Sequence, residues 1–288
     1  MQKISLSDYL KSYPFYLLPK HFLSALIHRF MRIKNELVKN NQIKLFIKAF
    51  PVNMQEAVRT QAEDYVDFND FFTRSLKADV RDLTQYNDKI ISPVDGQISE
   101  SGKIEDEQLI QAKGQHFSLT ELLAGNAELA NQFKEGTFLT IYLSPKDYHR
   151  IHMPLKGKLQ QMVHVPGELF SVNNSSVKIV PRLFARNERV INIFETAAGS
   201  MALIQVGAIF VSSIETVWHG EISPPRKKFI QNWNYPNSTI ELSQAEEMGR
   251  FNMGSTVVLL FAKNRIKLSE QLTKGDNIQL GNIIGDIL

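Results

Sequence analysis

The chain has 288 residues, of which 43% are hydrophobic and 22% charged, so it can build a sizeable core and is not intrinsically disordered. It contains no cysteine, which excludes disulfides, cysteine-based zinc sites and thiolate catalysis. The net charge is +3, but residues 1–50 alone carry nine Lys/Arg against Asp8 and Glu36. Such asymmetry predicts contact with an anionic surface, either nucleic acid or lipid.

Residues 20–50 show a helical apolar pattern. Apolar side chains recur at three- and four-residue spacing between Phe22 and Leu37, and the pattern resumes over residues 43–50. A basic amphipathic helix of this kind is typical of an interfacial membrane anchor. The alternative is a surface helix that packs its apolar stripe on the core. Nucleic acid is disfavoured, because the basic pattern does not continue into the rest of the chain.

No stretch approaches the ~18 apolar residues that cross a bilayer, and the N-terminus lacks the pattern of a signal peptide. Residues 51–90 have a polar, helical pattern, with an aromatic cluster at residues 68–72 that favours core packing. Strand-like residues then flank the turn Pro93-Val94-Asp95-Gly96, where Asp95 is a candidate to bond its own backbone. Ser118 fits the N-cap of a short helix over residues 121–124.

A strand-like run at residues 138–143 leads into the densest cluster of chemically active side chains. His149 and His152 lie three residues apart, bracketed by Pro145 and Pro154. They are candidates for acid–base catalysis, for a metal pair, or for a hydrogen-bonded pair inside the core. From residue 155 to 261, short apolar runs alternate with Gly/Pro/Asn turns. The sequence therefore predicts an α+β fold, with amphipathic N-terminal helices before a mostly antiparallel or mixed β-rich core.

Near the end of the chain, Gly254-Ser255-Thr256 opens an unbroken apolar run at residues 257–261 that predicts a buried strand. Ser255 supplies an oxygen nucleophile directly after the Gly254 carbonyl. An activated Ser255 can attack that carbonyl instead of an outside substrate. The alternative is an ordinary turn entering a strand.

Taken together, these motifs resemble those of bacterial phosphatidylserine decarboxylase, a pyruvoyl-dependent enzyme. The resemblance is carried by the Pro-x-Asp-Gly turn, by residues 148–154 (Tyr-His-Arg-Ile-His-Met-Pro) and by Gly254-Ser255-Thr256. Further matches are residues 68–72, 166–173, 184–190 and 213–218. Two positions depart from the family pattern: Met253 replaces the usual Leu, and Ser212 stands where Gly is common.

The resemblance implies a role for each matching residue. Asp95, His152 and Ser255 match the self-cleavage triad, in which Asp95 orients His152 and His152 deprotonates Ser255. The break falls between Gly254 and Ser255, and Ser255 becomes the pyruvoyl group. His149 matches a histidine implicated in decarboxylation, as the acid that reprotonates the former α-carbon.

Ser171 and its neighbour Phe170 lie in the motif that lines the family's substrate pocket. The family also implies that the pyruvoyl carbonyl forms a Schiff base with phosphatidylserine and acts as the electron sink for decarboxylation, without any metal. The products are phosphatidylethanolamine and carbon dioxide, in phospholipid biosynthesis.

The same resemblance implies a peripheral membrane protein on the cytoplasmic face of the cell membrane. Residues 1–60 are the expected membrane-associating helices and residues 61–288 the catalytic domain. Cleavage would leave residues 1–254 and 255–288 as a heterodimer, with higher oligomers left open and no nucleic acid bound. Phosphatidylserine is anionic, so each basic residue near the leaflet adds ~1 kcal/mol to membrane binding.

Three rival functions remain open on sequence alone. A serine hydrolase suits Asp95, His152 and Ser255, although the Gly-x-Ser-x-Gly elbow is absent. A non-catalytic lipid-binding module would use only the basic N-terminal segment, residues 1–50, which we call the basic arm. A pyruvoyl decarboxylase of a free amino acid is the nearest variant, and the basic arm argues against it.

Overall fold

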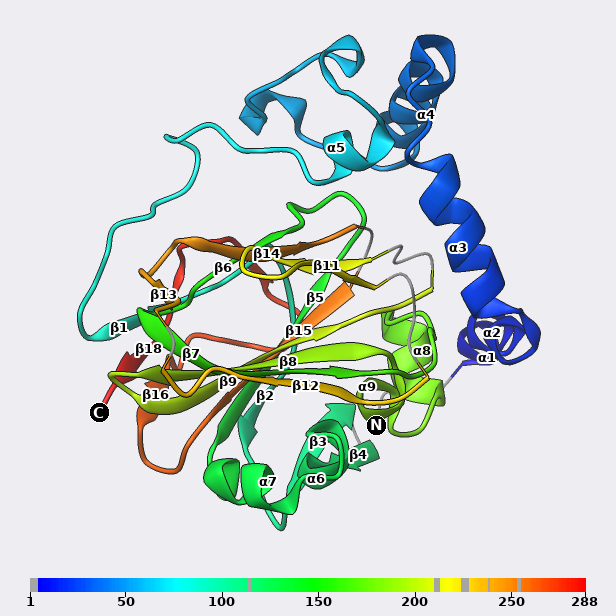
Figure 1. Ribbon diagram of the computed structural model, residues 1–288. Coiled ribbons are helices and arrows are strands. Elements are labelled where there is room, and N and C mark those ends of the chain that lie inside the picture. The colour runs from blue at the N-terminus through cyan, green and yellow to red at the C-terminus, as the bar shows by residue number, and fades with distance from the viewer. Residues whose placement is uncertain (1–4, 113–114, 210–212, 224–227, 238, 253–254) are drawn as a thin grey trace.

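The computed structural model describes residues 5–112, 115–209, 213–223, 228–237, 239–252 and 255–288. Helices gather at the N-terminal end and strands make most of the remainder, which confirms the predicted α+β fold (Figure 1). The helices are α1 (Leu6–Ser12), α2 (Pro14–Leu17), α3 (Lys20–Phe30), α4 (Glu36–Ala49), η1 (Met54–Glu56), η2 (Ala62–Asp64), α5 (Phe68–Phe72), α6 (Leu119–Leu122), α7 (Ala127–Phe133), α8 (Asn174–Ile179) and α9 (Leu183–Arg186). The strands are β1 (Lys89–Ile91), β2 (Gly96–Lys103), β3 (Gln108–Ala112), β4 (Gln115–Ser118), β5 (Thr137–Leu143), β6 (Arg150–His152), β7 (Gly157–Val165), β8 (Arg189–Thr196), β9 (Gly199–Val206), β10 (Ile214–Thr216), β11 (Gly220–Ser223), β12 (Gln231–Asn234), β13 (Glu241–Leu242), β14 (Glu247–Phe251), β15 (Ser255–Phe261), β16 (Ile266–Leu268), β17 (Asn277–Ile278) and β18 (Ile283–Ile287).

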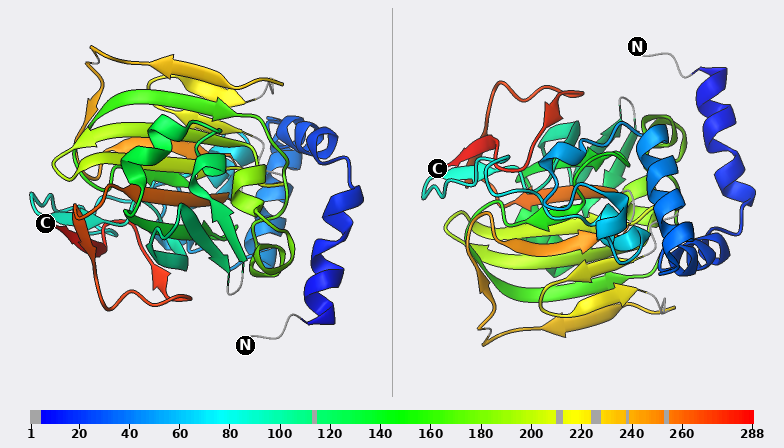
Figure 2. Two further views of the ribbon diagram at one scale, coloured as in Figure 1. Left: turned by 90° about the horizontal axis from the view of Figure 1, so that it is seen from below. Right: turned by 90° about the horizontal axis from the view of Figure 1, so that it is seen from above.

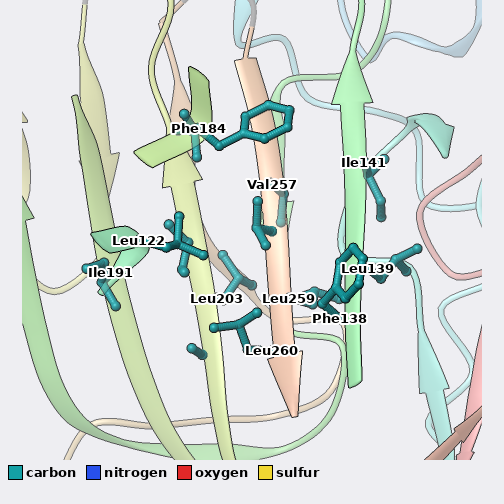
Figure 3. Close-up of a cluster of buried hydrophobic side chains, with 14 of the residues drawn as sticks. Leu122, Phe138, Leu139, Ile141, Phe184, Ile191, Leu203, Val257, Leu259 and Leu260 are labelled. Atoms are coloured by element: carbon teal, nitrogen blue, oxygen red, sulfur yellow. The ribbon is translucent and has the colours of Figure 1, made fainter. Parts of the chain in front are cut away.

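The main sheet places β15 at its centre. Within the described residues its strand order is β12-β7-β8-β9-β15-β5-β2-β17, with β13 beside β7. All seven residues of β15 are buried, and the strand pairs antiparallel with β9 on one side and β5 on the other. Figure 3 shows Leu259 between Leu203 of β9 and Leu139 of β5. This confirms the buried strand predicted over residues 257–261.

Two smaller sheets bring distant segments together. One has the order β11-β10-β14-β6, so that the histidine-bearing strand β6 pairs with β14, the strand that leads into β15. The other, β1-β18-β16, joins the start of the core to the end of the chain. The short helix predicted over residues 121–124 begins two residues earlier, as α6, and Ser118 caps it as expected.

The apolar pattern of residues 20–50 forms the helices α3 and α4. α3 ends at Phe30 and α4 begins at Glu36, because the side chain of Asn35 caps α4 by accepting a hydrogen bond from the Val38 amide. The helical expectation for residues 51–90 is wrong. There, Asn53 and Asp67 bond nearby backbone amides and limit the segment to η1, η2 and α5. As the sequence predicted, the aromatic residues of α5 pack in a core, shared with Met31 and Ile43.

The helix α3 presents part of its apolar stripe outward, whereas Ile27 packs against the core that contains α5. Phe22 and Leu26 are 68% and 56% exposed, whereas Lys20 is only 8% exposed. Figures 1 and 2 show α1–α3 along one side of the molecule, away from β1 and β18. The apolar stripe of α3 is therefore divided between an exposed face and a face that packs on the core. Among the described helices, none is long and apolar enough to cross a bilayer.

Candidate active site

Ser255 is the first residue of the central strand and is fully buried. In the sheet, Ser255 pairs with Leu143, the last residue of β5. Its Oγ has no hydrogen-bond partner among the described residues. An unpaired buried hydroxyl costs free energy. Met253 and Gly254, and with them the expected cleavage bond, lie outside the described residues, as does Ser212.

The segment that carries both histidines, residues 144–152, is called the histidine loop and starts where β5 ends. Asp147 closes a turn by accepting a hydrogen bond from the Ser144 amide at 2.7 Å. His149 follows and is fully buried, with its Nδ1 2.8 Å from the Asp147 carbonyl oxygen. Because a carbonyl can only accept, Nδ1 carries the proton and Nε2 holds a lone pair. That Nε2 has no partner in the part of the chain that the structure describes.

The surroundings of His149 keep it neutral. The ring of Phe72 packs on the imidazole with centroids 4.1 Å apart. Burial lowers the pKa of His149 to about 3, and the positive charge of Arg74 acts in the same direction. The resting His149 is therefore a proton acceptor at Nε2, and it must take up a proton before it can act as an acid.

His152 is held by two partners that the sequence did not indicate. Its Nδ1 lies 2.7 Å from the carbonyl oxygen of Ala245 and therefore carries the proton. Its Nε2 then accepts a hydrogen bond from the hydroxyl of Tyr148 at 3.0 Å. Burial lowers the pKa of His152, so this imidazole is also a base in its resting form.

Asp95 binds Arg81 rather than His152. Arg81 Nε and Nη2 donate to the two carboxylate oxygens at 3.1 and 2.5 Å, and the Leu280 amide adds a third hydrogen bond at 2.8 Å. Over the described residues, no hydrogen bond joins Asp95 to His152, nor either of them to Ser255. The turn reaches His152 through the main chain instead, since the His152 amide donates to the Pro93 carbonyl at 2.9 Å. Asp95 therefore does not bond its own backbone as the turn chemistry suggested.

Main-chain pairing brings the histidine loop and the Ser255 strand together. His152 lies opposite Glu247 in the β6–β14 pair. The amide of Phe251, four residues before Ser255, donates to the His149 carbonyl at 3.0 Å. Segments about 100 residues apart in the sequence thus meet at one place, beside the end of β5.

Comparison with known proteins shows which family the chain resembles. A family profile described as phosphatidylserine decarboxylase matches residues 68–286, and one described as PSD matches residues 10–51. The chain belongs to the phosphatidylserine decarboxylase family. Relatives named phosphatidylserine decarboxylase proenzyme include those of Shewanella amazonensis, 52% identical over 87% of this chain and 88% of the relative, and of Methylococcus capsulatus, 48% identical over 94% of each. That of Polaromonas naphthalenivorans is 47% identical over 98% of each chain.

In this member of the phosphatidylserine decarboxylase family, Phe170 and Ser171 lie next to the N-terminal helices. The Phe170 ring contacts the ring of Tyr16 at 5.0 Å, and Lys20 Nζ lies 4.5 Å from its centroid. Ser171 is partly exposed and accepts a weak hydrogen bond at 3.5 Å from the Asn173 amide.

Sequence reasoning missed four supports of this site: Arg81, Arg74, Tyr148 and the Ala245 carbonyl. Arg74 donates to the Lys146 carbonyl at 3.0 Å, within the histidine loop. The sequence contains a signal only for Tyr148, which directly precedes His149. Within the described ranges, no group of three or more His, Asp or Glu side chains is arranged to hold a metal ion.

Proposed function

We propose that this chain is a phosphatidylserine decarboxylase, which converts phosphatidylserine into phosphatidylethanolamine and carbon dioxide in phospholipid biosynthesis. The observation that carries the proposal is Ser255, buried with an unpaired Oγ at the head of the central strand of a chain in this family. The name proenzyme, which its relatives carry, fits a precursor that matures by cutting itself.

Self-cleavage uses Ser255 as the nucleophile. His152 Nε2 leaves Tyr148 and takes the Ser255 hydroxyl proton, and Oγ attacks the Gly254 carbonyl carbon. The amide bond breaks as an ester forms, and His152 returns the proton to the released nitrogen. Loss of a proton from the Ser255 α-carbon then expels the carboxylate of Gly254. The dehydroalanine that remains takes up water, loses ammonia and becomes the pyruvoyl group at the start of residues 255–288.

The residues present fit a pyruvoyl group at position 255. The strand behind it is buried over its whole length and paired on both edges, so the new N-terminus would be rigidly held. Once formed, the pyruvoyl group supplies the electron sink that decarboxylation of an amino acid needs. No metal is required.

His149 is the proposed proton carrier of the decarboxylation. Its neutral Nε2 can take a proton from the substrate's ammonium group and return that proton to the α-carbon after carbon dioxide leaves. Phe72 and the Asp147 carbonyl support this role, because they fix the ring and its tautomer. Because these contacts leave Nε2 unprotonated, His149 first accepts a proton as a base and then donates it as an acid.

Phe170 and Ser171 are proposed to line the path of the lipid substrate. Phe170 contacts α2 and α3 through Tyr16 and Lys20, so a lipid that enters from those helices meets this segment. The Ser171 hydroxyl can then donate to a phosphate oxygen of the head group.

The N-terminal helices are proposed to hold the enzyme on an anionic membrane surface, at the cytoplasmic face of the cell membrane. The large apolar side chains exposed along α1–α4 support this, as does the excess of basic residues. We assign residues 1–60 to membrane association and residues 61–288 to catalysis. The mature protein is then a heterodimer of the two pieces.

Intact-mass measurement of the purified protein tests the proposal. Two chains, residues 1–254 and 255–288, are expected, with carbon dioxide released from phosphatidylserine liposomes. Ser255→Ala should remain uncut and inactive, and His149→Ala should be cut but decarboxylate poorly. A single 32.9 kDa chain with an intact serine would reject the proposal and favour the hydrolase or the lipid-binding module. Activity on free serine but not on the lipid would favour the amino-acid decarboxylase.

Liposome flotation tests the membrane surface. Phe22→Ser with Leu26→Ser should weaken binding to vesicles that contain phosphatidylserine, and high salt should weaken it further. Phe229→Ser is the matched control, because Phe229 is an equally exposed aromatic residue (63% against 68%) that lies outside the helices. If the Phe22→Ser/Leu26→Ser double variant binds vesicles as well as Phe229→Ser does, α3 is a structural element only.

A further inference from the structure

Arg81 is a nearly buried cation in the segment that links α5 to β1. Its side chain is 6% exposed and that of Asp95 is 10% exposed. The two-pronged contact with Asp95 leaves Nη2 in reach of a second carboxylate, that of Glu56, at 2.8 Å. Arg81 therefore ties the η1 turn of the N-terminal part to the Pro-x-Asp-Gly turn of the core. An arginine fork matches a carboxylate in a way that a lysine cannot.

The hydrogen bonds of His152 show why this tie matters. Because its Nδ1–H is taken by the Ala245 carbonyl, Asp95 does not orient the imidazole directly. The orienting path runs from Arg81 through Asp95 into the turn, and from the Pro93 carbonyl to the His152 amide. The Leu280 amide holds the other side of the same carboxylate.

We propose that Arg81 is a positioning residue for self-cleavage, which acts by fixing Asp95 and, through the Pro93 carbonyl, the backbone of His152. The proposal rests on the self-cleavage described above. It changes the role of Asp95 from an imidazole partner to an anchor whose charge Arg81 balances.

The charge balance gives the proposal an electrostatic signature. The charged and titratable groups that face His152 come from the turn, from β14, from its own strand and from the preceding loop: Asp95, Glu247, Arg150 and Tyr148. The negative charge of Asp95 raises the pKa of His152 against the larger effect of burial, which lowers it. Without Arg81, that negative charge is unbalanced and raises the pKa of His152 further. Without the negative charge of Asp95, which raises the pKa of His152, and with Arg81 paired only to Glu56, that pKa falls.

The experiment follows cleavage of the newly made full-length chain by pulse-chase translation and mass analysis between pH 5 and 8. The variants are Arg81→Met, Arg81→Lys, Asp95→Asn and the double variant Arg81→Met/Asp95→Asn. Arg59→Met is the matched control, since Arg59 also makes a two-pronged contact with an aspartate, through Nη1 and Nη2 to Asp70 at 2.6 and 2.7 Å. If the wild-type chain is not cut, the proposed function fails, whatever the variants do.

Given a wild-type chain that cuts itself, Arg81→Met should cut at least tenfold more slowly, and Arg59→Met at the normal rate. In a plot of cleavage rate against pH, the fall in rate on the acid side (the acid limb) should move to higher pH in Arg81→Met and to lower pH in Asp95→Asn. The double variant should be no slower than the slower single one, because both substitutions break one contact. Arg81→Lys, which keeps the charge, should slow cleavage with little movement of the limb.

Three outcomes would overturn the proposal. They are normal cleavage by Arg81→Met, a double variant whose rate loss is the product of the two single losses, and acid limbs that stay in place. Should Arg81→Met fail to fold, Arg81→Lys decides, because cleavage at the wild-type rate would show that the two-pronged contact is not needed.

Discussion

Acid should destabilise this protein through His149, because the folded chain keeps the imidazole neutral and the unfolded chain does not. Burial lowers the pKa of His149 to about 3, whereas its ordinary value is 6.5. A group whose pKa is lower in the folded state stabilises the fold above the unfolded pKa. That contribution is lost as the pH falls toward the folded value. The window for His149 therefore runs from pH 6.5 down to about 3.

The size of the effect follows from the width of that window. Each pH unit within it costs about 1.4 kcal/mol of unfolding free energy. Between pH 7 and about 4.5, His149 alone should remove roughly 2 to 3 kcal/mol. A loss of this size is a large share of the marginal stability of a typical domain.

Urea unfolding at the two pH values measures this contribution. Ser255→Ala is the parent, so that unfolding does not separate two chains. His149→Asn in that background should lose roughly 2 to 3 kcal/mol less on acidification than the parent. His116→Asn, which changes an exposed histidine of β4, should lose as much as the parent. Equal acid losses by the parent and His149→Asn would refute the claim that His149 is held neutral, and with it the order of proton uptake and release.

Three further substitutions test other parts of the structure. Arg74→Met should leave the melting temperature unchanged or raise it, because burial lowers the pKa of Arg74 and two of its nitrogens lack partners among the described residues; turnover of phosphatidylserine should nevertheless fall about tenfold or more as the histidine loop loosens. Gly281→Ala should destabilise the fold and slow self-cleavage, because Gly281 has φ +90 and an added Cβ would lie within 1.9 Å of the Asp82 carbonyl. Leu259→Ala should cost about 2 to 5 kcal/mol in urea unfolding, whereas Leu26→Ala on the exposed face of α3 should cost little.

The strands were predictable because their signal is local. The apolar runs that form β15 and β5 are recognisable as strands from their hydrophobic residues alone. Residues 51–90 are predicted to be polar and helical, but their helical segments are the short η1, η2 and α5, with Asn53 and Asp67 as N-caps of η1 and α5. Side chains that bond nearby backbone amides compete with a continuous helix, and residue composition alone does not show this.

At the site, the sequence indicates the reactive side chains and misses what holds them. Both imidazoles donate to main-chain carbonyls, those of Asp147 and Ala245, and any residue type can supply a carbonyl. The pairing of Asp95 with Arg81 joins two segments whose proximity no spacing rule predicts. The triad implied by the resemblance pairs Asp95 with His152, whereas in the structure His152 Nδ1 donates to the Ala245 carbonyl oxygen.

The position of β15 also governs what a cut at residue 255 can do to the molecule. The small piece would contribute the middle strand of the main sheet and, through β17 and β18, partners for β2 and β1. Its removal would divide the sheet into halves, each with a bare hydrogen-bonding edge. If the chain is cut at residue 255, the two pieces therefore stay associated through the pairing of β15 with β9 and β5. We expect the sheet to form before such a cut, because a chain cut earlier would have to assemble its central strand from a separate piece.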